Sequence, residues 1–150
     1  MHREPPAKKI FISYTQADEA YLQDLKKQLF PIQRQGIVQT WDVSRLMPGE
    51  EGGVSTRREL QTAEIVLLLV SPDFMANEEV WNEEMKSAMA RHEKDKTVVI
   101  PIIIRPILWQ EAPFAKFKAL PANGLPVSSW NNTDEAWLEV AEKIKLIADY

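Results

Sequence analysis

Short apolar runs separated by amphipathic segments are the dominant pattern of this chain. Five runs predict strands: Lys9–Ser13, Gly36–Trp41, Ile65–Val70, Thr97–Ile104 and Pro126–Trp130. The runs at 65–70 and 97–104 lack regular polar alternation, which is typical of strands covered on both faces in a parallel sheet. Pro101 has no N–H group, so it predicts a bulge or an unpaired position in the fourth strand.

Apolar residues at helical spacing predict a helix after four of the five strands, and residues 105–122 after the fourth strand are expected to be irregular. These helices are expected from Glu19 to Phe30, where Pro31 ends the first, from Val54 to Thr62, from Asn77 onward, and after the capping residues Thr133–Glu135. Strands that alternate with helices favour a parallel sheet with right-handed crossovers. We therefore expect an α/β flavodoxin-like three-layer sandwich with a five-stranded parallel sheet in the order 2-1-3-4-5. Its ligand crevice lies beside strands 1 and 3.

One carboxylate falls inside the apolar stripe of the helix that follows the third strand. At about 100° per residue, the stripe consists of Val80, Trp81, Met85, Ala88 and Met89. Glu84 projects between Val80 and Ala88, near the strand end at which α/β folds bind ligands. Two interpretations are open: a partly desolvated functional carboxylate, or a glutamate at the stripe edge whose head reaches water.

Composition excludes several kinds of site. The 150 residues are enough for one domain, which we place at residues 9–150 after a flexible tail at residues 1–8. The chain has no cysteine and two histidines, so we expect no metal site, disulfide or histidine triad. A net charge of −4 argues against direct nucleic-acid binding. No apolar run reaches membrane-spanning length and no leader precedes the first strand, so we expect a cytoplasmic protein without a membrane contact.

The long segment Asp42–Gly53 contains Pro48-Gly49 and Gly52-Gly53, which indicate a loop. A loop of this length suits either a functional segment or a mobile surface excursion. The chain has no phosphate-binding GxxxxGK[ST] or GxGxxG motif and no GxSxG nucleophile elbow. Ser13-Tyr14 stands where a phosphoacceptor receiver domain would carry its acidic pair.

Four stretches, taken together, resemble the Toll/interleukin-1 receptor (TIR) domain family, in its bacterial NAD-cleaving form. They read KIFISYTQADEAYLQDLKKQL, WDVSRLMPGEEG, LLLVSPDFMANEEVWNEEMKSAM and VIPIIIRPILW. The second resembles the family's BB loop, and the third carries the Glu-Met pair on the helix after strand 3. The resemblance extends from Lys9 to Ala148. Val80 departs from the Cys-Trp pair of many bacterial members, and Gly52-Gly53 stands where many carry an aromatic residue.

The resemblance implies an NAD glycohydrolase or ADP-ribosyl cyclase with Glu84 as the catalytic residue, NAD as substrate and no cofactor. Its substrate-binding residues would be Ser13, Tyr14, Asp42, Arg45, Ser71 and Trp81. Each has a structural alternative: Tyr14 as a packing aromatic, Trp81 as core, Arg45 as a solvated cation, and Ser71 as the residue that ends its strand.

The resemblance also implies self-association through TIR–TIR contacts, with an assembly loop at Leu46, Met47, Pro48 and Gly49. A fused or associated sensor domain and a role in prokaryotic immune signalling would accompany the enzyme. The alternative is a non-catalytic TIR scaffold that acts by homotypic docking. A receiver-like or deoxyribosyltransferase-like hydrolase on the same sheet is a third, more distant interpretation.

Overall fold

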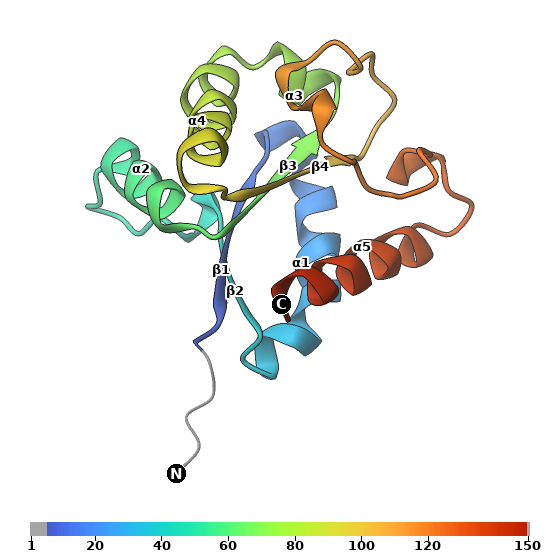
Figure 1. Cartoon of the computed structure of the whole chain (residues 1–150), viewed down its shortest axis with the longest axis horizontal. Coiled ribbons are helices and arrows are strands. Elements are labelled where there is room, and N and C mark those ends of the chain that lie inside the picture. Colours follow the sequence, from blue (N-terminus) through green and yellow to red (C-terminus); the bar gives the residue numbers. More distant parts are fainter. Residues whose placement is uncertain (1–5, 150) are drawn as a thin grey trace.

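The structure, a computed structural model, describes residues 6–149 and contains a parallel four-stranded sheet in the order β2-β1-β3-β4 (Figure 1). The strands are β1 (Lys8–Ser13), β2 (Val38–Trp41), β3 (Ile65–Val70) and β4 (Val98–Ile103). The predicted parallel α/β arrangement is confirmed for these four strands. The expected flexible tail at residues 1–8 falls mainly on residues 1–5, which lie outside the described residues, and β1 already begins at Lys8.

Alternate residues of the central strands enter two separate cores. In β3, Ile65, Leu67 and Leu69 pack in one core, whereas Val66, Leu68 and Val70 pack in the other. This alternation follows from the period of two along a strand, and it explains why the run shows no polar position. Burial on both faces holds β1 and β3 rigidly, so their carboxyl ends provide fixed attachment points for a site.

Helices cover both faces of the sheet (Figure 1). The first core is closed by α1 (Glu19–Arg34) and α5 (Thr133–Ala148), and the second by α2 (Gly52–Thr62), α3 (Pro72–Ala76) and α4 (Lys86–Asp95). The prediction that Pro31 ends the first helix was wrong, because α1 continues to Arg34 and buries Ile32. Pro31 lacks an N–H group, but Ile32 packs in the same core as Leu29, so the apolar face of α1 continues past the proline.

The fifth predicted strand was wrong. The segment expected as Pro126–Trp130 contains a 3₁₀ turn at Val127–Ser129 instead. Beside the outer edge of β4, only Leu120 forms an isolated parallel bridge among the described residues, accepting from the Ile103 N–H at 2.8 Å and donating to the Pro101 carbonyl at 2.9 Å. Proline residues at 121 and 126 supply no N–H groups, so they do not extend a ladder.

Pro101 causes no bulge in β4, since its neighbours keep a continuous register with β3. Its carbonyl group points to Leu120, away from β3. In a parallel strand the N–H and carbonyl groups of one residue face the same side, so the missing donor falls on the outer edge. The unpaired position predicted from the sequence is therefore confirmed, and the bulge is not.

The crossover after β3 differs from the uniform helix that the sequence predicted. A short helix, α3, comes first, and the Asn77 side chain then accepts a hydrogen bond from the Val80 N–H at 2.9 Å, as predicted for a helix cap. The next segment, η3 (Val80–Met85), is π-helical, and the Lys86 N–H bonds to the Trp81 carbonyl five residues earlier. Such π turns occur frequently at functional sites. Glu84 lies in this wider turn.

No helix in the part of the chain from residue 6 to residue 149 combines the length and apolarity that crossing a membrane requires.

Candidate functional site

The Glu84 carboxylate and the Ser13 hydroxyl form a buried pair between η3 and the end of β1. Ser13 Oγ donates to Glu84 Oε1 at 2.7 Å, although the two residues are 71 positions apart in the chain. Glu84 is 9% exposed and Ser13 is fully buried. Of the two interpretations of Glu84, the structure supports the desolvated carboxylate. Ser13 is held by the β1 ladder and fixes the orientation of that carboxylate.

Burial raises the pKa of Glu84 from its ordinary value of 4.5 to about 7. The hydrogen bond from Ser13 acts in the opposite direction because it favours the ionised form, and the nearby charge of Glu79 raises the pKa further. Desolvation outweighs the hydrogen bond. A carboxyl group with this pKa is partly ionised at neutral pH, which is the range in which a site can use either form.

Replacement of Glu84 by glutamine is expected to stabilise the fold at about pH 8 by roughly 2–3 kcal/mol. The folded-state pKa is raised, so the stability due to protonated Glu84 is complete below 4.5 and is lost as pH rises through about 7. The advantage of Glu84→Gln should therefore shrink as pH falls from about 7 to about 4.5. Urea denaturation across this range measures it, and a difference that does not change with pH contradicts the assigned pKa shift.

Tyr14 follows Ser13 and lines a cavity of ≈ 630 Å³ that opens beside Glu84. Its side chain is 5% exposed, and burial raises its pKa to about 12, with smaller contributions from Asp42, Glu19 and Glu84. The ring is therefore neutral at physiological pH. Tyr14 also belongs to the core on the α1 side, so the structure places it both as a packing aromatic and as part of the cavity wall.

The cavity lies at the carboxyl end of β1, enclosed by the loop after β2, by α2 and by the crossover segment that contains η3. Its lining comprises Tyr14, Thr15, Gln16, Val43, Leu46, Gly52, Gly53, Thr56, Arg57, Leu60, Asn77, Glu79, Val80, Glu83 and Glu84. The cavity adjoins the end of strand 1 through Tyr14, Thr15 and Gln16, whereas none of its described lining residues belongs to strand 3 or to residues 71–76 that follow it. Three carboxylates give one wall a negative character, and Arg57 is the only arginine or lysine among these lining residues.

Sequence reasoning did not single out Arg57, Glu79 or Glu83. The helix α2 begins at Gly52, two residues earlier than predicted, and the first turns of α2 border the cavity. The sequence pattern did not predict this placement, so Arg57 was overlooked. A Cβ atom on Gly53 would lie 3.5 Å from Arg57 Nη1, so the glycine leaves the backbone close to that guanidinium. The one feature of the sequence that could have indicated Arg57 is its position four residues after Gly53, which puts both residues on the same face of a helix.

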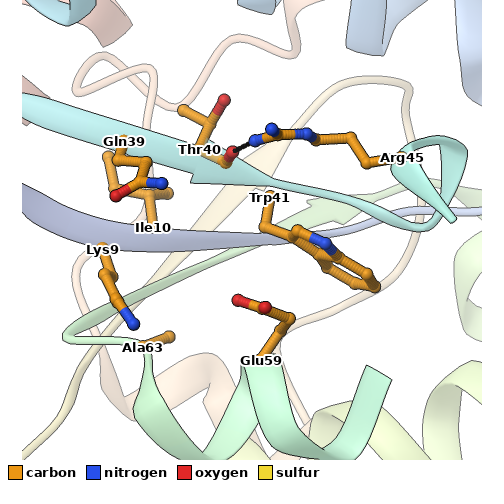
Figure 2. Close-up of a pocket in the computed structure, with 8 residues that line it drawn as sticks. All are labelled: Lys9, Ile10, Gln39, Thr40, Trp41, Arg45, Glu59 and Ala63. Carbon is orange, nitrogen blue, oxygen red and sulfur yellow. Dashed lines mark hydrogen bonds between the residues drawn. The ribbon is translucent and has the colours of Figure 1, made fainter. Parts of the chain in front are cut away.

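Asp42 and Arg45 do not line this cavity. The buried Asp42 carboxylate accepts from the Ser44 N–H at 2.9 Å and pairs with Lys26 Nζ at 3.2 Å, which fixes the start of the loop. Arg45 Nη1 donates to the Thr40 carbonyl at 2.6 Å at the outer edge of β2, where it lines a different cavity (Figure 2). The contacts of both residues here are structural, contrary to the expectation that they border the crevice.

Ser71 and Trp81 also have structural contacts. Ser71 Oγ accepts from the Phe74 N–H at 3.0 Å, which caps α3, and the hydroxyl donates to buried Asp18. Trp81 packs edge-on against Phe114 with ring centroids 6.2 Å apart. Neither residue is part of the cavity lining. Their structural alternatives, strand end for Ser71 and core packing for Trp81, are the roles that the structure displays.

The expected assembly loop forms an exposed turn. The Glu50 N–H bonds to the Met47 carbonyl at 3.1 Å, and Gly49 adopts φ +93°, which favours glycine at the third turn position. Met47 is 66% exposed, whereas Leu46 points to the cavity and contributes to its lining. The loop thus connects the cavity to the molecular surface. Among residues 6–149, no group of three or more His, Cys, Asp or Glu side chains could hold a metal ion.

Comparison with known proteins gives two results. A family model described as "TIR domain" matches residues 10–139. The "Uncharacterized protein y4lF" of Sinorhizobium fredii (strain NBRC 101917 / NGR234) is 41% identical over 136 residues, which cover 91% of this chain and 42% of that protein. The chain thus spans less than half the length of this relative.

Proposed function

The chain belongs to the TIR domain family, and from that premise we propose that it cleaves the nicotinamide–ribose bond of NAD as a glycohydrolase or ADP-ribosyl cyclase. The family includes enzymes that cleave NAD. The observation that carries the proposal is the Glu84 carboxylate, buried, oriented by Ser13 at 2.7 Å and placed at the wall of a ≈ 630 Å³ cavity.

One carboxylate is sufficient for this reaction. The nicotinamide leaving group departs from a pyridinium as a neutral molecule, so it requires no general acid, unlike most glycosides. Positive charge develops instead on the ribose as the bond breaks. An ionised, desolvated Glu84 would stabilise that charge more strongly than it stabilises the ground state, and it would accept hydrogen bonds from the ribose hydroxyl groups.

The remainder of the cavity suits the other parts of NAD. The Tyr14 ring borders the cavity near Glu84, where it would lie against the nicotinamide. Arg57 would contact the diphosphate, because a guanidinium donates paired hydrogen bonds to phosphate oxygens. The volume falls within the usual range for small-molecule and cofactor sites. Arg57 therefore replaces Arg45 as the arginine proposed for the diphosphate.

Nicotinamide release should rise with pH through about 7, the pKa of Glu84. The proposed role requires the carboxylate form, so kcat/KM is expected to increase about tenfold per pH unit below that value and to level off above it. The assay uses concentrated protein with a crowding agent, because the proposed activity depends on self-association. Absence of nicotinamide release under these conditions across the whole pH range would contradict the proposal.

Non-catalytic docking is the second candidate function, and the exposed Met47 turn favours it. TIR domains commonly self-associate. A cavity of ≈ 240 Å³ between β4 and α5 has a mainly apolar lining, including Leu120 and Leu146, and Lys118 and Lys143 are also among its lining residues. Acidic Glu50 and Glu51 follow Met47. We propose that the Met47 turn of one copy enters this cavity of a second copy, with opposite charges facing each other.

Met47→Glu is expected to weaken self-association at least tenfold, because it places a charge in an apolar contact. Sedimentation at several protein concentrations measures this effect. Leu108→Glu is the matched control, since Leu108 is 80% exposed and lies outside both the turn and the cavity. Equal effects of the two substitutions would show that the turn is not the contact.

The Sinorhizobium fredii relative is more than twice as long as the segment that this chain matches. Since the chain covers 42% of that protein, we propose that the TIR domain works beside a further domain that senses a signal and gathers the TIR copies, as in prokaryotic immune signalling.

A further inference from the structure

A second cavity, of ≈ 250 Å³, lies at the edge of the sheet between α2 and the strands β1 and β2 (Figure 2). Its lining consists of Lys9, Ile10, Gln39, Thr40, Trp41, Arg45, Glu59 and Ala63. None of these residues lines the cavity beside Glu84. The helix α2 contributes Glu59 to this cavity and Arg57 to the other, so the two cavities are separate spaces that share one helix.

The cavity contains a fixed aromatic surface. The half-buried Trp41 indole stacks on Phe11 with ring centroids 5.5 Å apart and an interplanar angle of 28°, which holds the orientation of the indole. The remaining surface of the indole lines the cavity, above α2 in the view of Figure 2. A preoriented indole is suited to a flat heteroaromatic ring, because stacking needs no reorganisation of the side chain.

Two opposite charges face the same space without pairing. The Glu59 carboxylate and the Lys9 ammonium group both point into the gap between the sheet and α2 (Figure 2), and no salt bridge within 4.0 Å joins these two described side chains. The Gln39 amide adds one donor group and one acceptor. A ring whose edge carries both amino donors and ring or carbonyl acceptors satisfies these groups together. Nucleobases have such an edge.

Arg45 is a cationic lining residue on the β2 side of the cavity. One nitrogen of its guanidinium is fixed by the Thr40 carbonyl at 2.6 Å. A guanidinium has five N–H donors, so this fixed group retains donors for a phosphate. The anchoring to Thr40 also reduces the side-chain entropy that phosphate binding would otherwise cost.

We propose that this cavity is a binding site for a nucleoside monophosphate. The base lies against Trp41 with its edge between Glu59 and Lys9, and the phosphate lies at Arg45. The volume is well below that of the cavity beside Glu84, which matches a mononucleotide rather than a dinucleotide. The site does not depend on whether the chain cleaves NAD, so the two proposals can fail separately.

Titration of the full chain with adenosine monophosphate tests the site, with adenosine and inorganic phosphate as parallel probes. Calorimetry measures affinity, and the indole N–H resonance of Trp41, identified from its loss in Trp41→Phe, reports occupancy of this cavity. We expect saturable binding of the monophosphate, a shift of the Trp41 resonance, and several-fold weaker binding of adenosine. Glu59→Gln should weaken binding of the monophosphate about tenfold. Glu142→Gln, on the exposed face of α5, should leave the affinity for the monophosphate unchanged.

Arg45→Gln gives the sharpest discrimination, because it should bring the affinity for the monophosphate down to that for adenosine while leaving adenosine itself unaffected. Three results would overturn the proposal. One is the absence of saturable binding of the adenosine, cytidine, guanosine and uridine monophosphates. Another is binding that leaves the Trp41 resonance unmoved. The third is a Trp41 shift that phosphate alone reproduces, which would indicate a simple anion site.

Discussion

Glu84→Gln is expected to lower the proposed NAD cleavage by about 10²–10³-fold or more, with little change in substrate affinity. The substitution keeps the size of the side chain and an oxygen that accepts from Ser13 Oγ, which lies 2.7 Å from the carboxylate in the parent. It removes only the negative charge that would face the developing positive charge on the ribose. Nicotinamide release by the concentrated protein, followed at saturating and at limiting NAD, separates kcat from KM.

The same variant is expected to be more stable than the parent at alkaline pH, so a loss of turnover cannot be attributed to unfolding. Glu93→Gln is the matched control on α4, the helix that follows η3, because Glu93 is exposed and pairs with Lys116 at 2.7 Å, outside the cavity. Parent-like turnover in Glu84→Gln would overturn the assignment of the catalytic residue. A parallel loss in Glu93→Gln would point to a general charge effect instead.

Asp18→Ala is expected to reduce the free energy of unfolding by about 3 kcal/mol. Asp18 is fully buried where α1 begins, and its carboxylate accepts from Thr15 Oγ1 at 3.1 Å, from Arg105 Nε at 2.9 Å and from Ser71 Oγ. These partners follow β1, β4 and β3, so one side chain joins three strand ends. Its removal leaves polar groups without partners inside the fold. Equilibrium denaturation in urea measures the change.

Asp73→Ala provides the comparison, because Asp73 pairs with the same Arg105 but its side chain is 52% exposed. Solvent screens an exposed pair, so a loss below about 1 kcal/mol is expected. If the two alanine variants were equally stable, the buried network around Asp18 would not be the link between the strand ends.

The local sequence pattern was sufficient to predict the segments that are completely buried. The continuous apolar run Ile65–Val70 identified the central strand. The place of Glu84 within the stripe from Val80 to Ala88 singled out this carboxylate but left open whether it is buried, which the structure shows. The Asn77 cap was also correct, because a cap depends on residues adjacent in the chain. Such features are fixed by the side-chain period and by short-range hydrogen bonds, which a sequence displays directly.

The sequence-based predictions were wrong where contacts between residues distant in the chain override the local conformational preference. Pro31 does not end α1, because burial of Ile32 favours continuation of the helix. The segment around Val127 turns instead of adding a strand, and Leu120 occupies the outer edge of β4. Arg45 and Arg57 lie in similar polar contexts of the sequence, yet only Arg57 lines the cavity beside Glu84. Whether an arginine faces that cavity depends on where the loop after β2 ends and α2 begins.

The sequence by itself determined the parallel α/β architecture, its central strands and the candidate carboxylate, because apolar period and helix caps are local properties of the chain. Only the tertiary structure decided that Ser13 meets Glu84 across 71 residues, that Asp42 and Ser71 serve the fold, and that Trp41 borders a cavity of its own. Packing of distant strands and helices sets these distances, and no periodicity within a single segment contains them.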